Sequence, residues 1–331
     1  MLDQSKRQIK IGEVVLALDA DGGDVTFISH AHSDHACYEK SAKKVVASAE
    51  TLKLIGSSKQ NVAIEGANLL EAGHMLGSRQ ISLEVDGGVF VYTGDFKIEH
   101  GLTTGGADIP SECDYLMIEG TYGEPGAVFP PREDVFLEME KWLSKNKDNI
   151  VLIGAYEIGK AQEVVKFLNK YCSIEPIVTK KIDFFCRVYE EFGHRFKRVV
   201  APSKEADEMY KDAFVSVLPM EQASFNLASK LSYIYGKKTL CTRVTGWAYK
   251  RTKNADRVFC LSDHADFPGI LKYVEAANPR RVYCVHGNEE ILANELRKRG
   301  VDALAIPKFG AKKRVVQSTL EVYNALTRTN I

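Results

Sequence analysis

The sequence predicts a mixed α/β protein in which a layered sheet structure is interrupted by a parallel-sheet insert. Two observations carry this prediction. The polar clusters of the chain directly follow short apolar runs, as happens where buried strands end at one edge of a sheet. Between residues 125 and 237, helical segments alternate with short apolar strands, which is the βαβ pattern of a parallel sheet. We therefore expect a first domain at residues 1–124, an insert at 125–237 and a return to the first domain at 238–331.

Composition limits the classes of protein that the chain can belong to. The 44 Lys and Arg balance the 44 Asp and Glu, so any attraction to nucleic acid must come from a local patch. The cysteine count is odd, seven, and no C-x-x-C pair occurs, which argues against a disulfide framework and favours reduced thiols. The N-terminus lacks the apolar region of a signal peptide, and no apolar stretch is long enough to cross a bilayer. We expect a cytoplasmic protein without a membrane partner.

Short strands and turns make up the first part of the chain. The expected elements are strands at 9–11, 14–18, 25–28, 69–70, 81–85, 89–92 and 115–118. Ser48 precedes helically spaced apolar residues and Gly56 follows them, so a helix is predicted over residues 48–55. Asp86-Gly87-Gly88 predicts a hairpin turn between the two strands that flank it.

Helices alternate with short strands in the middle of the chain. The insert is expected to contain helices at 132–143, 159–168, 181–192 and 203–214, and strands at 150–153, 176–178 and 215–218. From residue 238 the sequence again shows short apolar strands followed by polar clusters, as in the first part of the chain. The elements expected there are strands at 239–242, 258–261 and 282–285 and helices at 267–277 and 289–299.

The segment His30-Ala31-His32-Ser33-Asp34-His35 is the strongest chemical signal. It places three of the eight histidines and a carboxylate directly after an apolar strand. Alternate side chains of an extended segment share one face, so His30 and His32 can converge on one ion, while Asp34 and His35 can point at a second. Imidazole and carboxylate ligands suit zinc, with manganese or iron disfavoured rather than excluded. The alternative is a surface loop that is merely rich in histidine.

Further polar side chains follow other predicted strands. These strand-end residues are His74, Asp95, Glu119, His264 and His286. His74 lies between glycines, which permit close approach of backbone to a ligand. His100 and His194 have no such setting, and we expect both on the surface.

Together these motifs resemble the metallo-β-lactamase fold, specifically its β-CASP nuclease branch, over nearly the whole chain. The H-x-H-x-D-H loop, a later lone His, a G-D-[FY] Asp and a final His all have counterparts here. Glu119-Gly120-Thr121-Tyr122-Gly123 is similar to the acidic motif of the branch, and Gly159-Lys160-Ala161-Gln162-Glu163 to a helix start early in its insert. The resemblance implies a four-layer αββα metallo-β-lactamase fold with an inserted α/β, parallel-sheet β-CASP domain.

The resemblance also implies a ligand set and catalytic roles. Two Zn²⁺ ions, with Mn²⁺ as a substitute, would be held by His30, His32 and His74 at one position, by Asp34, His35 and His286 at the other, and by Asp95 between them. The implied catalytic residues are His264, Glu119 and Asp34. His264 would protonate the leaving 3′-oxygen as general acid, with Glu119 positioning it and favouring its protonated form. The alternatives are a core histidine at 264 and a capping or surface carboxylate at 119.

The stretch from residue 237 to 257 is a candidate contact for nucleic acid. It contains seven basic residues against Asp256 alone, with aromatic residues interleaved. Basic residues follow phosphates and aromatic rings stack on bases, which is typical of single-strand binding. The residues expected to bind nucleic acid are Lys160, Arg243, Trp247, Lys250, Arg251 and Lys253. The alternatives are a solvated basic face and a core position for Trp247.

The function favoured by the resemblance is a di-zinc phosphodiesterase, an exonuclease acting on single-stranded nucleic acid ends. Thr245-Gly246-Trp247-Ala248 and residues 261–269 are similar to exonucleases encoded with DNA ligases, which favours DNA end processing and makes ligase or repair proteins candidate partners. His286 is typical of RNA-acting members, so RNA 3′-end processing of the cleavage-and-polyadenylation type stays open. Less favoured are a small-molecule metallohydrolase and a catalytically inactive nucleic-acid-binding subunit. The oligomeric state, monomer or homodimer, stays open.

Overall fold

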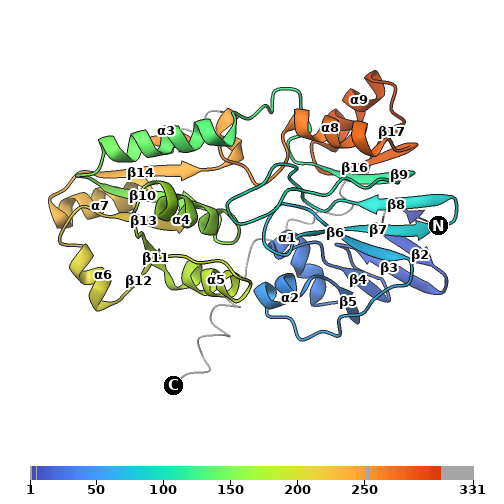
Figure 1. Cartoon of the computed structure of the whole chain (residues 1–331), viewed down its shortest axis with the longest axis horizontal. Coiled ribbons are helices and arrows are strands. Elements are labelled where there is room, and N and C mark those ends of the chain that lie inside the picture. Colours follow the sequence, from blue (N-terminus) through green and yellow to red (C-terminus); the bar gives the residue numbers. More distant parts are fainter. Residues whose placement is uncertain (1, 5, 251–253, 307–331) are drawn as a thin grey trace.

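Two lobes lie side by side in the computed structural model, which describes residues 2–4, 6–250 and 254–306 (Figure 1). The two-sheet lobe carries β1 to β9, β16 and β17 with helices α1, α2, α8 and α9. The parallel-sheet lobe carries β10 to β15 with helices α3 to α7. The chain passes from the first lobe into the second after β9 and returns after β15.

The first sheet of the two-sheet lobe has the order β1-β2-β3-β4-β5. Its strands are Leu2–Asp3, Gln8–Ile11, Val14–Leu18, Val25–Phe27 and Lys44–Val46. β3, β4 and β5 are parallel, so their carboxyl ends meet at one edge. The helices of this half are α1, Ser33–Ala36, and α2, Ala49–Ile55, with a 3₁₀ turn at Cys37–Glu39. Ser48 caps α2 by accepting the Thr51 N–H, and Gly56 ends it in the left-handed conformation, as predicted.

The second sheet has the order β17-β16-β9-β8-β7-β6. In chain order its strands are Ala67–Glu71, Arg79–Val85, Gly88–Tyr92, Tyr115–Gly120, Arg281–Gly287 and Ala303–Ala305. Phe90 and Tyr92 of β8 pack with Leu16 and Phe27 of the first sheet. The neighbouring residue Val91 faces the opposite way, into the cluster formed with α8, Phe267–Ala277, and α9, Glu289–Lys298.

Helix, sheet, sheet and helix therefore form four layers, because α2 covers the outer face of the first sheet. Leu52 of α2 packs on the cluster formed by Ile28, Val45 and Ala47. The alternation along β8 explains why two sheets stack here, since residues of opposite parity face opposite sides of a strand. The four-layer fold that the resemblance implies is confirmed.

The parallel-sheet lobe has the strand order β12-β11-β13-β10-β14-β15. In chain order its strands are Ile150–Ala155, Ile177–Thr179, Val199–Ala201, Val215–Pro219, Thr239–Val244 and Arg257–Phe259. Its helices are α3, Arg132–Lys145, α4, Lys160–Tyr171, α5, Lys180–Glu191, α6, Lys204–Met209, and α7, Phe225–Tyr235, with a 3₁₀ turn at Gly246–Lys250. Val151 and Ile153 of β10 face one helical layer, and Ile150 and Leu152 face the other. Burial on both faces explains the continuous apolar run in this strand.

The strands that follow residue 238 were expected to belong to the first domain, but the first two of them join the other sheet. β14 pairs with β10 and β15 pairs with β14, both in parallel, so these strands extend the sheet of the middle region. Short apolar strands look alike in sequence, and nothing in their composition says which sheet they join. The three-part domain division stays a prediction. Helix α6 ends at Met209, earlier than expected, and α7 was not expected at all.

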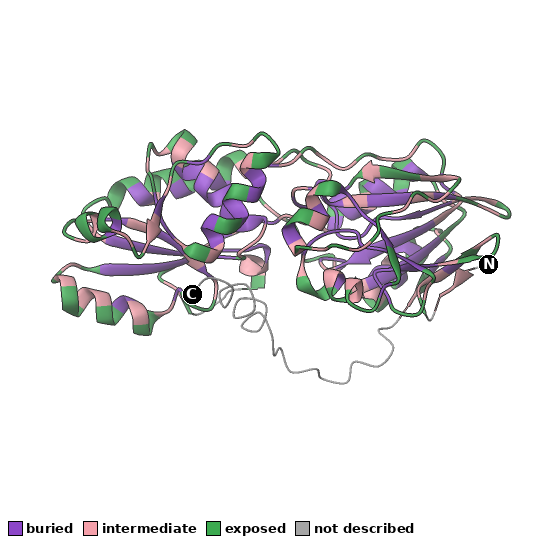
Figure 2. Cartoon of the chain, turned by 90° about the horizontal axis from the view of Figure 1, so that it is seen from below, coloured by how far each residue is buried: buried purple, intermediate pink, exposed green. Residues whose placement is uncertain are grey.

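One hydrophobic cluster of the core is shared by the two lobes. Ala31, Leu54 and Met75 of the two-sheet lobe belong to the same buried cluster as Val164 and Tyr189 of the parallel-sheet lobe. Figure 2 shows buried residues running through the sheets of both lobes. No helix among the described residues is long and apolar enough to cross a membrane.

This shared core predicts that Leu54→Ala destabilises the whole protein. Leu54 is 4% exposed, and truncating a buried leucine costs about 2–5 kcal/mol of unfolding free energy. The matched control is Leu137→Ala, since Leu137 is 48% exposed on α3 and should change stability by less than about 0.5 kcal/mol. Urea denaturation measures both; equal effects of the two substitutions would contradict a core shared across the lobes.

Candidate metal centre

Strand ends deliver the candidate ligands to one place. The His30–His35 segment follows β4, Asp95 follows β8, and Glu119 lies at the end of β9. β8, β9 and β16 run parallel, so their carboxyl ends meet at one edge of the second sheet. His74 lies between β6 and β7. Gly73 before it has φ +71°, and any Cβ there would collide with the Lys97 carbonyl oxygen, so only glycine fits.

Four side chains form a compact group with the spacing of metal ligands. His30, His32, His74 and Asp95 each offer one ligand atom, and these atoms all lie within 4.8 Å of one another. Asp95 Oδ2 is 3.5 Å from Nε2 of His30 and 4.0 Å from Nε2 of His74. Nδ1 of His32 is 3.0 Å from Nε2 of His74. This is the first of the two ligand groups expected from sequence.

The outer nitrogens of two imidazoles in this group are held by backbone carbonyls. Nε2 of His32 donates to the Ile158 carbonyl at 3.1 Å, and Nδ1 of His74 donates to the Asp263 carbonyl at 2.9 Å. A carbonyl only accepts, so these outer nitrogens carry the hydrogen and the inner nitrogens of the neutral rings carry lone pairs. Burial and the neighbouring histidines hold the pKa of His74 well below its usual value, which keeps the ring neutral.

The inner atoms of the group fit a cation. The facing lone pairs of His32 and His74 repel each other unless a proton or a cation lies between them. Among the described residues, Nε2 of His30 and Oδ1 of Asp95 are buried without a hydrogen-bond partner. A nitrogen- and oxygen-donor set of this kind suits zinc.

The second expected group is less compact. His35 Nε2 lies 3.5 Å from Asp95 Oδ2 and 3.8 Å from Asp34 Oδ2, and the Asp34 side chain is 72% exposed. Nε2 of His286 accepts a hydrogen bond from the Arg7 guanidinium at 3.0 Å and lies 3.3 Å from the Tyr92 hydroxyl. Because a permanent cation holds this nitrogen, the donors of the second position do not fit an ion in this arrangement.

Asp19 explains the state of His35 and was not expected from the sequence. Its carboxylate, fully buried at the end of β3, is 2.7 Å from His35 Nδ1 and also accepts the Ser29 and Tyr92 hydroxyls. Burial lowers the pKa of His35, but Asp95 and Asp19 together raise it to about 10. The strand-end rule that found Asp95 could have found Asp19, since it directly follows the apolar run of β3. No comparable pattern marks Arg7.

The buried carboxylate of Glu119 forms an ion pair with the half-buried His264 beside this centre. His264 Nδ1 is 2.9 Å from Glu119 Oε1, and the imidazole ring lies 4.4 Å from that of His74. Glu119 also accepts the Phe96 and Thr121 N–H groups, which fixes the carboxylate. Burial lowers the pKa of His264, but the Glu119 carboxylate raises it to about 9. The structure thus brings together His264 and Glu119 as the sequence predicted.

Comparison with known proteins decides the family. The chain is 33% identical to "Probable RNase MJ4" of Methanocaldococcus jannaschii over 300 residues, which cover 75% of this chain and 68% of that protein. The chain belongs to the β-CASP metallo-β-lactamase nucleases. Residues 255–307 match the family described as Zn-dependent metallo-hydrolase RNA specificity domain.

Two further relatives differ in how much of their length this β-CASP chain spans. It is 32% identical to "Probable DNA ligase" of Opitutus terrae over 303 residues, 85% of this chain but 28% of that protein. It is 22% identical to "5' exonuclease Apollo" of Gallus gallus over 312 residues, 89% of this chain and 65% of that protein.

The residues predicted to contact nucleic acid are scattered in this β-CASP chain. Lys160 is 1% exposed, and its ammonium lies 2.5 Å from Asp263 Oδ1 and 3.3 Å from Glu163 Oε2. Its charge is therefore neutralised inside the protein instead of facing solvent, and Arg243 is half-buried. Arg251 and Lys253 lie outside the described residues. His100 is exposed and His194 is half-buried.

Trp247 and Lys250 lie in an aromatic cluster beside His264. The Trp247 ring lies 4.8 Å from the Tyr122 ring, which in turn lies 5.7 Å from His264. Lys250 is exposed above Trp247 and Tyr249, and its ammonium is 2.6 Å from Glu124 Oε1. Trp247 is half-buried against the core of the two-sheet lobe, so core packing and an exposed edge coexist in one residue.

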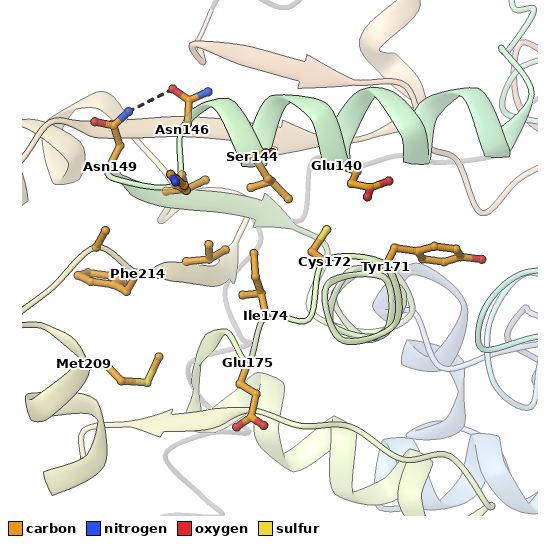
Figure 3. Close-up of a pocket in the computed structure, with 15 residues that line it drawn as sticks. Glu140, Ser144, Asn146, Asn149, Tyr171, Cys172, Ile174, Glu175, Met209 and Phe214 are labelled. Atoms are coloured by element: carbon orange, nitrogen blue, oxygen red, sulfur yellow. Dashed lines mark hydrogen bonds between the residues drawn. The ribbon is translucent and has the colours of Figure 1, made fainter.

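A cavity of about 570 Å³ lies in the parallel-sheet lobe (Figure 3). It is lined by the first residues of β10 and β13, including Val151 and Val215, and by residues at the ends of α3 and α4, among them Asn146 and Cys172. None of the candidate site residues lines it. Ligands of parallel sheets bind at the carboxyl ends of strands, so this amino end is the less favoured place.

The different fit of the two ligand groups predicts unequal zinc binding. His74→Ala should remove the tightly held ion, because it deletes one of four converging donors, whereas His286→Ala should keep it. Chelator competition followed by elemental analysis of the protein measures the metal content of both variants. Loss of the tight ion in His286→Ala, at a level equal to that in His74→Ala, would show that the two groups act as one site.

Proposed function

We propose that this chain is a metal-dependent phosphodiesterase that removes nucleotides from the ends of single-stranded nucleic acid, in DNA end processing or repair. The observation that carries the proposal is the His264–Glu119 ion pair held next to four converging metal ligands. An acid beside an electrophilic centre is what cleavage of a phosphodiester needs, since charge builds on phosphate oxygens while the leaving oxygen requires a proton.

The metal centre that we propose holds zinc, with Mn²⁺ as a substitute. A zinc ion bound at His30, His32, His74 and Asp95 would supply Lewis-acid stabilisation of phosphate charge. The orphaned Nε2 of His30 and Oδ1 of Asp95 support this position. A second ion at Asp34, His35 and His286, shared through Asp95, requires that Arg7 first release Nε2 of His286.

His264 is proposed as the general acid and Glu119 as its partner. The ion pair keeps a proton on Nδ1 of His264, and the protonated ring can donate a second proton from Nε2. Because the pKa of His264 is raised to about 9, the ring is charged at neutral pH and able to protonate a leaving 3′-oxygen. Asp34, on the exposed side of the centre, is proposed as a further catalytic residue.

The names of the relatives favour DNA ends as the substrate, with RNA as the alternative. The Opitutus relative is named a probable DNA ligase and the chicken relative a 5′ exonuclease, whereas the Methanocaldococcus relative is named a probable RNase. We therefore propose single-stranded DNA as substrate, a DNA ligase or repair proteins as partners, and RNA processing as the alternative. Trp247 and Lys250 are proposed to contact the strand. All seven cysteines are free thiols, which suits a reducing compartment such as the cytoplasm.

Digestion of matched oligonucleotides tests the proposal. Zinc-loaded protein should release mononucleotides from labelled single-stranded DNA, and His264→Ala should lower kcat by roughly 10²–10⁴-fold because the acid is lost. His100→Ala, at an exposed histidine, is the control and should keep full activity. Intact DNA and RNA in the wild type would contradict the proposal, and discrete internal cuts in RNA would favour the alternative.

Glu119→Gln separates the acid from the metal ligands. The substitution removes the charge that raises the pKa of His264, so kcat should fall while the zinc content stays that of the wild type. Asp95→Asn should lower both, because Asp95 is a ligand. Elemental analysis and kcat of the two variants make the comparison. Loss of zinc from Glu119→Gln would instead make Glu119, which lies within 4.8 Å of ligand atoms of Asp95 and His264, a metal ligand.

A further inference from the structure

Lys160 forms a buried ion pair that links the two lobes at the metal centre. It is the first residue of α4 in the parallel-sheet lobe, and its ammonium lies 2.5 Å from Oδ1 of Asp263. Asp263 belongs to the segment that follows β15 and directly precedes His264. Both side chains are largely inaccessible, at 2% and 12% exposed, so this pair is not a solvated surface contact.

The same segment reaches two candidate ligands through backbone carbonyls. The Asp263 carbonyl accepts from Nδ1 of His74 at 2.9 Å, so the residue that Lys160 holds also orients that imidazole. Two residues before Lys160, the Ile158 carbonyl accepts from Nε2 of His32 at 3.1 Å. The parallel-sheet lobe thus acts on both histidines whose inner nitrogens face each other.

Gly159 lies where the backbone of the parallel-sheet lobe meets the two-sheet lobe. Its φ of +85° is a conformation that favours glycine, and a Cβ there would lie 3.4 Å from Met75 Cβ and 3.6 Å from Asp263 Oδ2. The backbone of α4's first turn therefore lies directly against the two-sheet lobe, with no side chain between.

The two-sheet lobe holds the same segment from the other side. The buried Lys97 ammonium donates to the Ser262 carbonyl at 2.5 Å, and the Ala265 N–H donates to the Phe96 carbonyl at 2.7 Å. Asp263 lies between these two anchors. Lys160 is the ionic contact that the parallel-sheet lobe makes with it, and this fixes where its carbonyl points.

We propose that Lys160 is a positioning residue of the metal centre: through Asp263 it sets the orientation of His74, and together with the Ile158 carbonyl it makes docking of the parallel-sheet lobe a condition for tight metal binding. The inference rests on the proposed function only in taking His32 and His74 as metal ligands. Partners that hold the outer nitrogen of a metal-binding histidine typically change metal affinity by roughly 10–100-fold when they are lost.

Zinc affinity of charge variants tests this inference. Lys160→Met should weaken zinc binding by roughly 10–100-fold in competition with a chromogenic chelator, and should alter the visible absorption of the cobalt-substituted protein. Lys160→Arg keeps the charge and should recover most of the affinity. Lys170→Met, on the exposed end of the same helix, is the control and should bind zinc as the wild type does.

A double variant separates positioning from mere loss of a buried pair. Lys160→Met removes the ammonium that lies 2.5 Å from the Asp263 carboxylate, and Lys160→Met/Asp263→Asn removes the charge of that carboxylate as well. Positioning predicts that the double variant still binds zinc weakly, because the anchor of the carbonyl is missing. Wild-type affinity in the double variant, or in Lys160→Met, overturns the inference.

Hydrogen exchange tests the inference on the wild-type protein, so the result does not depend on whether a variant folds. Zinc should slow exchange of the Gly159 and Ala161 amides, which are bonded to Gln162 Oε1 and the Tyr156 carbonyl, while amides of β12 stay unchanged. Unchanged exchange at Gly159 and Ala161 in zinc-bound protein overturns the inference. These readouts follow zinc alone, so an absence of nuclease activity would defeat the proposed function and leave this inference standing. Active nuclease with unaltered zinc affinity in Lys160→Met would do the reverse.

Discussion

His30, His74 and Asp95 are buried next to one another, and protons alone cannot satisfy them. Burial pushes the pKa of both imidazoles well below the usual value, so they stay neutral and present lone pairs to a buried carboxylate and to His32. Protonated His35 lies 3.5 Å from Oδ2 of Asp95, but Oδ1 of Asp95 is buried without a hydrogen-bond partner among the described residues, and the facing lone pairs of His32 and His74 repel each other. A cation removes both costs at once. The fold around these residues therefore holds the four donors at a spacing that suits a positive ion.

The strand arrangement supplies that spacing. β8, β9 and β16 are parallel neighbours, so residues at their ends are separated by the distance between strands rather than by flexible loops. The outer nitrogens are then fixed by groups that cannot titrate, the carbonyls of Ile158 and Asp263. Since one of these carbonyls belongs to each side of the lobe junction, the shared core of the lobes and the geometry of the ligands depend on each other.

The sequence could predict the part of the site that follows from spacing. His30 and His32 alternate in an extended segment, and His74 and Asp95 each follow a strand, so their convergence is a consequence of periodicity. Whether a charged side chain is buried, and which residue it pairs with, leaves no such pattern in the sequence. The sequence predicts a nucleic-acid contact at Lys160 because it shows the charge of the residue but not its surroundings. The structure places that charge against Asp263. β14 and β15 likewise read as ordinary apolar strands, and their sheet is decided by tertiary pairing with β10.

The two expected ligand groups differ in what surrounds them, and Arg7 is the reason. Its guanidinium is a permanent cation in hydrogen-bond contact with His286, near Asp19 and Tyr92. Two unit charges of like sign 4 Å apart repel by about 4 kcal/mol near a protein surface, so an ion at His286 competes with Arg7 for the same negative field. The group His30, His32, His74 and Asp95 has no arginine among its described contacts; the cations next to it are the imidazoliums of His35 and His264, which can lose their protons. If Arg7 released Nε2 of His286, that nitrogen could bind an ion and the local positive charge would fall at the same time, so occupation of the second ligand group depends on the position of Arg7.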